Sequence, residues 1–392
     1  MGNSELNRIS PPGVIGIIGG GQLGRMSALA ARAMGYRVVV LEPNNPCACT
    51  PVVDEQIVAE YDDAAGLERL FSLADVVTFE FENVQKGPLE SFAGKKPVRP
   101  SPLILSIAQN REREKTFFSQ HGFPVAPFRV IGSDEDVEAI VAEGFQFPAI
   151  LKTADFGYDG KGQVSVDSPN ELMAAWKTFA GARAVLEEKI HFLAEYSMII
   201  VRSPSGDLVT YPLCRNIHRN HILDLTYSPA VPQVGSVDQA DQICREVAEK
   251  LELEGVLVIE LFLTEGGDWI INEMAPRPHN SGHFSIDGSD TSQFENHIRS
   301  VCNQPLGSTG GFGVSAMINL LGDELQENGP ALAERVLGTP GAHLHLYDKG
   351  EAKSGRKMGH INLVCQDSDL LQERVVSLRD QLGLPPIPYC SH

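Results

Sequence analysis

Residues 14–24 read V-I-G-I-I-G-G-G-Q-L-G. The apolar run at 14–18 has the length of one buried strand, and three consecutive glycines close it. Apolar residues then recur at helical spacing from Leu23 to Met34. The sequence therefore predicts a strand, a tight glycine turn and a helix, which is the opening unit of a parallel α/β domain.

The residues that follow repeat this pattern. Buried-strand runs occur at 37–41 and 75–79, and the stretch 64–73 between them has helical spacing. Strands that alternate with helices form a doubly wound parallel sheet. Prolines between 97 and 102 mark the end of this domain, and a charged helix is expected at 110–121.

Beyond residue 147 the chain changes to strands joined by tight turns. The turns S-G-D at 205–207 and G-G-D at 266–268 are typical of antiparallel hairpins, which predicts an α+β domain. Further strands are expected at 149–152, 184–186, 196–202, 313–321 and 342–347, with helices at 169–179 and 368–382. We expect a Rossmann-like substrate domain at 1–109, an α+β domain at 110–304 with a lid at about 124–190, and a small C-terminal domain at 305–392.

The composition is that of a folded, acidic chain. Of the 392 residues 42% are hydrophobic, which is enough for several buried cores. The 51 acidic and 32 basic residues give a formal net charge of -19, which argues against binding to nucleic acid or to an anionic membrane. An anionic substrate must therefore meet a local basic patch.

Cysteine usage and the N-terminal residues predict the compartment. The seven cysteines include no C-x-x-C pair, which is typical of reduced, mostly buried thiols in a cytosol. No cationic region followed by an apolar stretch begins the sequence, and no apolar run reaches transmembrane length. We expect a cytoplasmic protein.

The glycine turn has the spacing of a dinucleotide fingerprint, Gly19-x-Gly21-x-x-Gly24, and Glu42 ends the next strand where a ribose-binding carboxylate would lie. Taken alone this pattern favours NAD. Its physical content is broader, because glycines let backbone N–H groups approach any phosphate at a helix N-terminus. We favour the phosphate of another substrate, with Gln22 as an additional contact, over NAD or an empty turn.

Glu80 follows the strand at 75–79, at the edge where open α/β sheets bind ligands. We interpret it as a substrate-binding carboxylate, and the alternative is a solvated turn. Lys152 ends a predicted strand, and a loop with three glycines and Lys161 follows at 157–163. The loop lacks the order G-x-x-x-x-G-K-[ST] of a P-loop, so we expect a mobile lid whose lysines act as point charges on a triphosphate.

Two predicted strands, 258–262 and 270–274, each carry one carboxylate inside an apolar run. A carboxylate in an apolar core needs a partner, and oxygen ligands on adjacent strands suit Mg²⁺ that bridges ATP phosphates. Glu260 and Glu273 are therefore predicted to form a metal site, and a structural ion pair is the alternative.

The stretch 275–283, A-P-R-P-H-N-S-G-H, places basic residues next to this metal site. Arg277 can offset charge on a transferred phosphate or carboxyphosphate. His279 can contact the substrate or move a proton. The densest basic stretch, at 349–357, is a second candidate clamp for a phosphate monoester, with a solvated loop as the alternative.

These segments, in this order, resemble the ATP-grasp superfamily. Within it the chain resembles the 5-(carboxyamino)imidazole ribonucleotide synthetases, also called the ATPase subunits of phosphoribosylaminoimidazole carboxylase. The resemblance extends from about residue 14 to residue 382. The subfamily is indicated by F-E-N at 81–83, P-R-P-H-N-S-G-H at 276–283 and K-S-G-R-K-M-G-H at 353–360.

The resemblance implies an ATP-grasp fold, a homodimer and a set of site residues. ATP would be held by Arg111, Lys152, Gly157, Tyr158, Asp159, Gly160, Lys161, Gly162, Gln163, Glu187, Glu188, Lys189, Ile190, Glu195, His218, Asn272 and Glu273. The nucleotide substrate would be held by Gln22, Leu23, Glu80, Tyr158, Arg277, His279, Lys349 and Arg356. The metal, Mg²⁺ or Mn²⁺, would be bound by Glu260 and Glu273, and the transferred group would be contacted by Lys152, Lys161 and Arg277.

The implied reaction is the ATP-dependent carboxylation of 5-aminoimidazole ribonucleotide with bicarbonate, through carboxyphosphate, in purine synthesis. We assign no general base. Two alternatives remain: another ATP-grasp carboxylase or ligase that acts on a different amine, and an NAD-dependent dehydrogenase. The dehydrogenase would need no ATP and would leave Glu260 and Glu273 without a purpose.

Overall fold

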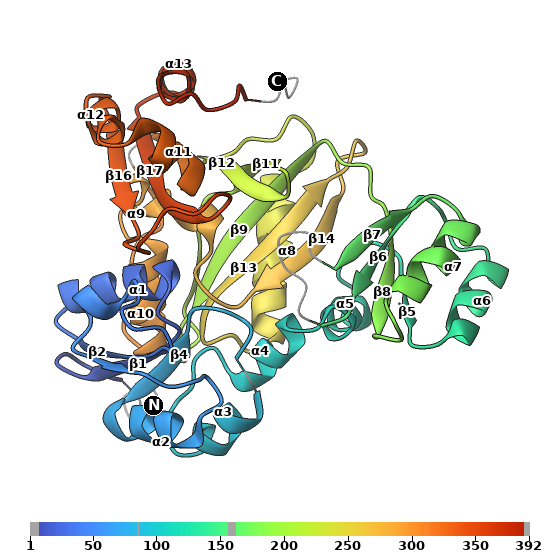
Figure 1. Cartoon of the computed structure of the whole chain (residues 1–392), viewed down its shortest axis with the longest axis horizontal. Helices are drawn as coiled ribbons and strands as arrows, with labels where there is room; N and C mark the ends of the chain where they lie inside the picture. The colour runs from blue at the N-terminus through green and yellow to red at the C-terminus, as the bar shows by residue number, and fades with distance from the viewer. Residues whose placement is uncertain (1–7, 85, 156–161, 312, 388–392) are drawn as a thin grey trace.

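The computed structural model in Figure 1 describes residues 8–84, 86–155, 162–311 and 313–387. Within these ranges the strands form three sheets. The loop residues 157–161, which the sequence assigns to ATP, lie outside the described residues. No described helix is long and apolar enough to cross a membrane.

The N-terminal sheet is parallel and has the order β3-β2-β1-β4. Its strands are β1 (Val14–Ile18), β2 (Arg37–Leu41), β3 (Glu55–Ile57) and β4 (Val76–Phe79). Helices α2 (Ala64–Leu73), α3 (Lys86–Ala93) and α4 (Pro102–Ala108) cover one face. Helix α1 (Gln22–Ala33) covers the other face together with α10 (Gln293–Val301) from much later in the chain. The doubly wound parallel arrangement expected from the sequence is confirmed.

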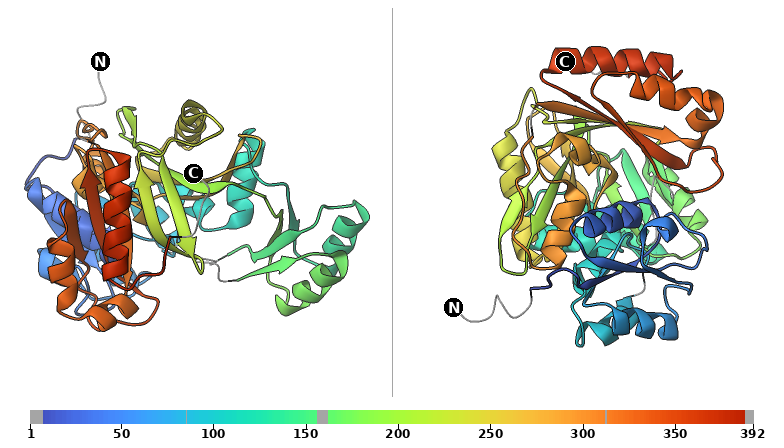
Figure 2. Two further views of the ribbon diagram at one scale, coloured as in Figure 1. Left: turned by 90° about the horizontal axis from the view of Figure 1, so that it is seen from above. Right: turned by 90° about the vertical axis from the view of Figure 1, so that its left-hand side faces the viewer.

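The lid is an antiparallel sheet with the order β5-β8-β6-β7. It contains β5 (Phe128–Ile131), β6 (Ala149–Thr153), β7 (Gln163–Val166), β8 (Ala184–Glu188), α6 (Asp134–Ala142) and α7 (Pro169–Thr178). These elements bury a core of their own. Figure 1 and the left view of Figure 2 show the lid projecting from the rest of the molecule, next to helix α5 (Arg111–Gln120).

The central sheet is antiparallel and has the order β14-β13-β9-β11-β12-β15-β17-β16, with β10 added to β9. Its first part contains β9 (Ala194–Arg202), β10 (Leu208–Thr210), β11 (Cys214–Arg219), β12 (Ile222–Ser228), β13 (Gly255–Leu263) and β14 (Trp269–Ala275), with α8 (Val237–Lys250) packed against it. The turns at 205–207 and 266–268 join antiparallel neighbours, as predicted.

The C-terminal strands continue this sheet. Strand β15 (Val314–Leu321) pairs with β12, and β17 (Lys357–Cys365) and β16 (Ala342–Leu346) follow. Helices α11 (Gly322–Asn328), α12 (Ala331–Leu337) and α13 (Ser368–Gln381) pack on it (Figure 2, right view). One sheet therefore crosses the boundary drawn at residue 304, although the domain limits themselves stay a prediction.

The predicted strands and helices differ from the observed ones by at most two residues at either end, except that β13 begins at Gly255, three residues before the predicted start. The sequence analysis gave no residue range for β3, β5, β7, β10, β11, β12, β17, α3, α4, α6, α8, α10, α11, α12 or the short α9 (Ser285–Gly288). Strand β17 begins in the basic stretch and buries His360 and Asn362, which hides its apolar pattern. The described cysteines are free thiols, and all except Cys47 are buried, as expected.

Candidate functional site

A cleft of about 980 Å³ opens between the N-terminal sheet, the lid and the central sheet. Most of the residues that the sequence assigned to the site line it, namely Gln22, Leu23, Glu80, Arg111, Lys152, Gln163, Glu187, Glu188, Lys189, Ile190, Glu195, His218, Glu260, Asn272, Glu273, Arg277 and His279. Among the described residues, Gly162, Lys349 and Arg356 do not belong to this lining. Burial raises the pKa of Glu80, and the charge of Lys349, which lies near it, opposes part of this shift.

The lid side of the cleft contains a buried cluster of two lysines and one carboxylate. Glu187 Oε2 lies 3.1 Å from Lys152 Nζ and 3.2 Å from Lys115 Nζ, and all three side chains are largely buried. Burial alone would raise the pKa of Glu187, but the two ammonium groups lower it. Glu187 therefore acts in this structure as the counterion of two lysines, although the sequence analysis assigned it to ATP directly.

Lys115 was missed by the sequence analysis. It follows Arg111 by four residues on α5, which places both side chains on the same face of the helix. Its ammonium group also donates to the carbonyl oxygen of Asn272 at 2.7 Å, so it joins the lid cluster to β14. The sequence contains a signal for this residue, because Arg111 and Lys115 are four positions apart in a helix that Asn110 is suited to cap.

The predicted acidic pair lies on the central sheet. Glu260 on β13 pairs with Glu273 on β14, and a β-bulge at this point leaves Asn272 as the extra residue of β14. The Asn272 amide donates to Glu260 Oε2 at 3.4 Å. Glu260 is half-buried and Glu273 is exposed to the cleft, so the expectation that both acids lie inside an apolar core was wrong for Glu273.

The charge around this pair fits a divalent cation. Burial, together with Glu273, raises the pKa of Glu260 to about 8, and burial raises the pKa of the adjacent Glu114 to about 8. Within the described ranges no group of three or more His, Cys, Asp or Glu side chains has metal-binding geometry. Two carboxylates completed by substrate phosphates are the usual protein share of a Mg²⁺ site, so the residues present fit that ion.

Two basic residues beside the acids are already paired. Arg277 Nε lies 2.8 Å from Glu82 Oε1, so the arginine is held by the F-E-N segment after β4. His218 on β11 forms an ion pair with Glu195 on β9. Burial opposes protonation of His218, but Glu195 raises its pKa. Glu82, like Lys115, was not assigned to the site by the sequence analysis, which quoted it only as part of the F-E-N segment.

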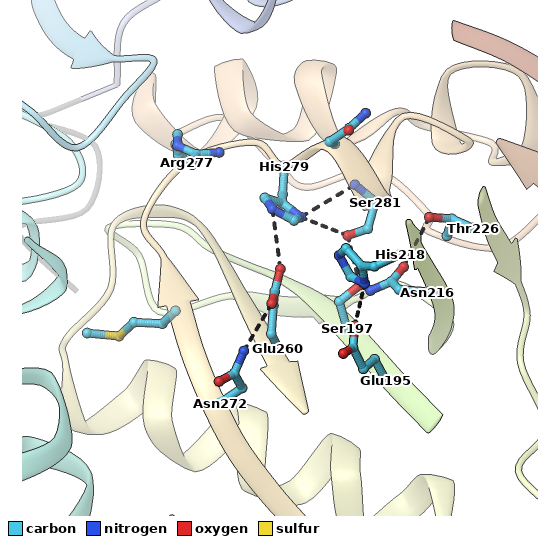
Figure 3. Close-up of polar contacts among 12 residues, drawn as sticks. Glu195, Ser197, Asn216, His218, Thr226, Glu260, Asn272, Arg277, His279 and Ser281 are labelled. Carbon is cyan, nitrogen blue, oxygen red and sulfur yellow. Dashed lines mark hydrogen bonds and ion pairs between the residues drawn. The ribbon is translucent and has the colours of Figure 1, made fainter. Parts of the chain in front are cut away.

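His279 stands above Glu260 (Figure 3). Its Nε2 atom lies 3.6 Å from Glu260 Oε1, and its Nδ1 atom faces Ser281. Burial lowers the pKa of His279 well below its usual value, and the nearby Arg277 acts in the same direction.

The backbone N–H groups of the glycine turn donate hydrogen bonds to two carboxylates of the protein itself. Glu80 accepts hydrogen bonds from the N–H groups of Gly21 and Gly24, the latter at 2.6 Å. Glu42 accepts from Gly20 N–H at 2.9 Å and from the Tyr61 hydroxyl at 2.6 Å, and it is buried. These groups are not available to a pyrophosphate, which argues against the NAD alternative and against phosphate capture by the glycines themselves.

Comparisons with known proteins agree with this geometry. The sequence matches the ribonucleotide synthetase preATP-grasp domain at residues 13–109, the ATP-grasp domain at 116–294 and the phosphoribosylaminoimidazole carboxylase C-terminal domain at 315–374. It is 41% identical over 363 residues to N5-carboxyaminoimidazole ribonucleotide synthase of Bacillus subtilis strain 168, covering 92% of this chain and 94% of that protein. The chain belongs to the N5-carboxyaminoimidazole ribonucleotide synthase family.

Solved structures of this family have the same fold. The ADP complex of an N5-carboxyaminoimidazole ribonucleotide synthetase has a TM-score of 0.90 and 41% identity and covers 96% of this chain and 99% of its own. An enzyme of this family from Aspergillus clavatus, solved with ADP and 5-aminoimidazole ribonucleotide, has a TM-score of 0.84 and 28% identity, with 94% and 98% covered. The ATP-grasp fold and the family expected from the sequence are confirmed, and the roles of the individual residues stay predictions.

Proposed function

We propose that the protein carboxylates the 5-amino group of 5-aminoimidazole ribonucleotide, with ATP and bicarbonate as the other substrates. The observation that supports this proposal most directly is that two groups of residues line the same cleft. Glu260, Glu273, Lys115 and Lys152 form the part that would bind ATP, called the nucleotide half below. Glu80 and Gln22, at the start of α1, form the part that would bind the substrate. Family membership and the ligands of the related structures support the proposal.

The nucleotide half is suited to a triphosphate. Lys152, Lys115 and Arg111 line the same cleft as Glu260 and Glu273. A Mg²⁺ ion, or Mn²⁺, held by Glu260 and Glu273 would offset phosphate charge. The predicted contacts with Tyr158 and Lys161 concern residues outside the described ranges.

The substrate half is suited to an amine that carries a phosphate. Helix α1 begins at Gln22, and the first N–H groups of a helix have no partner within it, so Gln22 and Leu23 offer donors to a phosphate. Lys349 and Arg356 would add positive charge. Glu80 is a hydrogen-bond acceptor beside them, which suits an amine rather than a second phosphate.

The reaction then proceeds in two transfers. A bicarbonate oxygen attacks the γ-phosphorus of ATP, ADP leaves, and carboxyphosphate forms. The 5-amino group attacks the carboxyl carbon, of carboxyphosphate or of CO2 released from it, with loss of phosphate and one proton. Lys152 and Arg277 would offset charge on the transferred oxygens, and exclusion of water would protect the intermediate.

The test is ADP release by the purified protein with ATP, Mg²⁺ and bicarbonate, with and without 5-aminoimidazole ribonucleotide. We expect a strong dependence on the nucleotide, abolished in Glu273→Gln and unchanged in Glu265→Gln, an exposed glutamate in the turn of the same hairpin. ADP release that the nucleotide does not stimulate would contradict the substrate assignment and would favour an ATP-grasp ligase for a different amine.

The homodimer implied by the resemblance is also part of this proposal. The chain has a mass of 42.6 kDa. Light scattering of the purified protein is expected to give twice this mass, and a particle of one chain would contradict the assignment.

A further inference from the structure

His279 offers a lone pair, not a proton, at its Nδ1 atom. The backbone N–H of Ser281 points at Nδ1 from 3.4 Å, and the side chain of His279 caps the short helix η2 (Asn280–Gly282) in this way. A backbone amide can only donate. Nδ1 must therefore be the acceptor and carries no proton, so the ring has a single N–H, which is on Nε2.

A series of side-chain hydrogen bonds that ends at Ser281 is consistent with an accepting Nδ1 atom (Figure 3). Thr226 donates to Asn216 Oδ1 at 3.0 Å, and the Asn216 amide donates to Ser197 Oγ at 3.0 Å. Ser197 in turn donates to Ser281 Oγ at 2.7 Å. Because Ser281 receives this proton, its own proton is left for His279 Nδ1, 2.9 Å away.

The members of this series are buried polar groups in the middle of an apolar sheet. Ser197, Ser281 and Thr226 have no exposed surface, and Asn216 keeps 6%. Burying such groups is unfavourable unless each finds a partner, and here each one does. Hydroxyl groups can donate in either direction along such a series, and the backbone N–H of Ser281 selects the direction that ends in donation to His279 Nδ1.

Gln293 holds the backbone of the same residue. Its Oε1 atom accepts from His279 N–H at 3.0 Å, and its Nε2 atom donates to the His279 carbonyl oxygen at 2.7 Å. Gln293 is fully buried on α10. Ring and backbone are thus both fixed, so rotation of the imidazole would break hydrogen bonds that nothing in the described residues replaces.

We propose that Ser281 and Gln293 are positioning residues that hold His279 as the Nε2–H tautomer, with this proton directed into the cleft. His279 is then a hydrogen-bond donor to oxygen atoms of the transferred group and takes no proton from the substrate amine at Nε2. The position of the proton follows from the contacts alone, and the identity of the acceptor rests on the proposed function.

The first test reads the tautomer without substrate. The protein labelled with ¹⁵N in its histidines is examined by NMR, and the His279 signals are assigned by their absence in His279→Asn. We expect a protonated Nε2 and an unprotonated Nδ1. A protonated Nδ1 in the unaltered protein would overturn the proposal, whatever reaction the enzyme catalyses.

The second test links the tautomer to turnover. Ser281→Ala keeps the backbone N–H that faces Nδ1 but removes the hydroxyl donor. It is therefore expected to raise the population of the Nδ1–H tautomer and to lower kcat of ADP release about tenfold, the equivalent of one net hydrogen bond, with KM for ATP unchanged. Ser300→Ala is the matched control, because Ser300 is equally buried and its hydroxyl donates to the His297 carbonyl oxygen of its own helix. Equal kcat in both variants would overturn the proposal.

A second variant covers the case in which Ser281→Ala does not fold. Ser197→Ala keeps the Ser281 hydroxyl but removes the donor that orients it, so a smaller fall in kcat and a partly mixed tautomer are expected. An unchanged tautomer in a folded Ser197→Ala protein would contradict the role of the series. If the unaltered protein has the Nε2–H tautomer but 5-aminoimidazole ribonucleotide does not stimulate its ADP release, only the proposed function is contradicted.

Discussion

Glu187 separates two lysines that would otherwise repel each other inside the protein. Its carboxylate contacts Lys115 and Lys152, and its other oxygen has no hydrogen-bond partner in the described part of the chain. A triphosphate that reaches the lysines would compete for the same ammonium groups. The residue is therefore a counterion that keeps the lysines charged and in place before ATP arrives.

The change Glu187→Gln removes this counterion. Breaking a buried ion pair from one side leaves an uncompensated charge, so we expect a loss of about 3 kcal/mol in the free energy of unfolding and a higher KM for ATP. Urea denaturation and steady-state kinetics measure both. Glu143→Gln, which removes an exposed partner of Arg129, serves as control and should change stability by less than about 1 kcal/mol. Equal effects of the two changes would show that the lysine cluster has no special energetic role.

Lys349 predicts how substrate affinity depends on pH. Burial, with a contribution from the charge of Arg356, lowers its pKa to about 8. The ammonium form is the one that attracts a phosphate, and its population falls as pH rises through this pKa. KM for 5-aminoimidazole ribonucleotide should therefore rise above pH 8, by up to about tenfold per pH unit.

Lys349→Arg separates this cause from others, because a guanidinium stays charged throughout the range. The rise in KM above pH 8 should disappear in that variant while it remains in the unaltered protein. If both proteins show the same pH profile, another group is responsible.

At the scale of elements, helix α5 connects the lid to the acid pair. Its N-terminal cap is Asn110, whose side-chain Oδ1 atom accepts from Arg113 N–H at 3.0 Å and whose Nδ2 atom donates to Asp155 Oδ1 at 2.7 Å. Asn110 therefore fixes both the start of the helix that carries Arg111 and Lys115 and the chain just after β6. The Asn110 side chain thus positions both α5 and the chain after β6, which lie on two sides of the ATP-binding part of the cleft.

Asn110→Ala should lower the free energy of unfolding by about 1 kcal/mol, as the loss of a helix cap does, and also raise KM for ATP. Ser133→Ala is the matched control, because Ser133 caps α6 in the lid and does not line the cleft. It should show a similar stability loss with KM for ATP unchanged. A KM change of the same size in both variants would contradict the role assigned to α5.

At the scale of the whole molecule, the central sheet joins parts of the chain that the sequence suggests are separate. β12 pairs with β15, and the core under α12 and α13 contains Ile217 and Leu225 from β11 and β12. The lid has a sheet and core of its own. Cooperative unfolding should follow these sheets rather than the domain limits.

Hydrogen exchange followed by mass spectrometry checks this expectation. The amides of β9, β12, β15 and β17 should exchange together and slowest, while those of β5 to β8 exchange in an earlier event. Addition of ADP should slow exchange in the lid most, because a ligand bound to both parts would tie the less stable lid to the central sheet. Exchange of β15 and β17 ahead of β9 would show that the C-terminal part unfolds independently.

The sequence predicts local units well and long-range pairings poorly. The strand, glycine turn and helix at 14–34 follow from spacing, and so do the hairpin and the acid pair at Glu260 and Glu273. The pairing of β12 with β15 leaves no local signal, because the two strands are far apart in the sequence. Ser197, Asn216 and Thr226 interrupt apolar strands in a way that only their shared hydrogen bonds explain.

The closed glycine turn has a consequence for which molecules the N-terminal domain rejects. Glu42 and Glu80 occupy the N–H groups that dinucleotide-binding relatives of this fold would offer to a pyrophosphate. A cofactor of that kind would meet two carboxylates in place of donors and be repelled. The donors of the turn are thus already satisfied within the chain, so the glycine spacing alone does not make this turn a dinucleotide site.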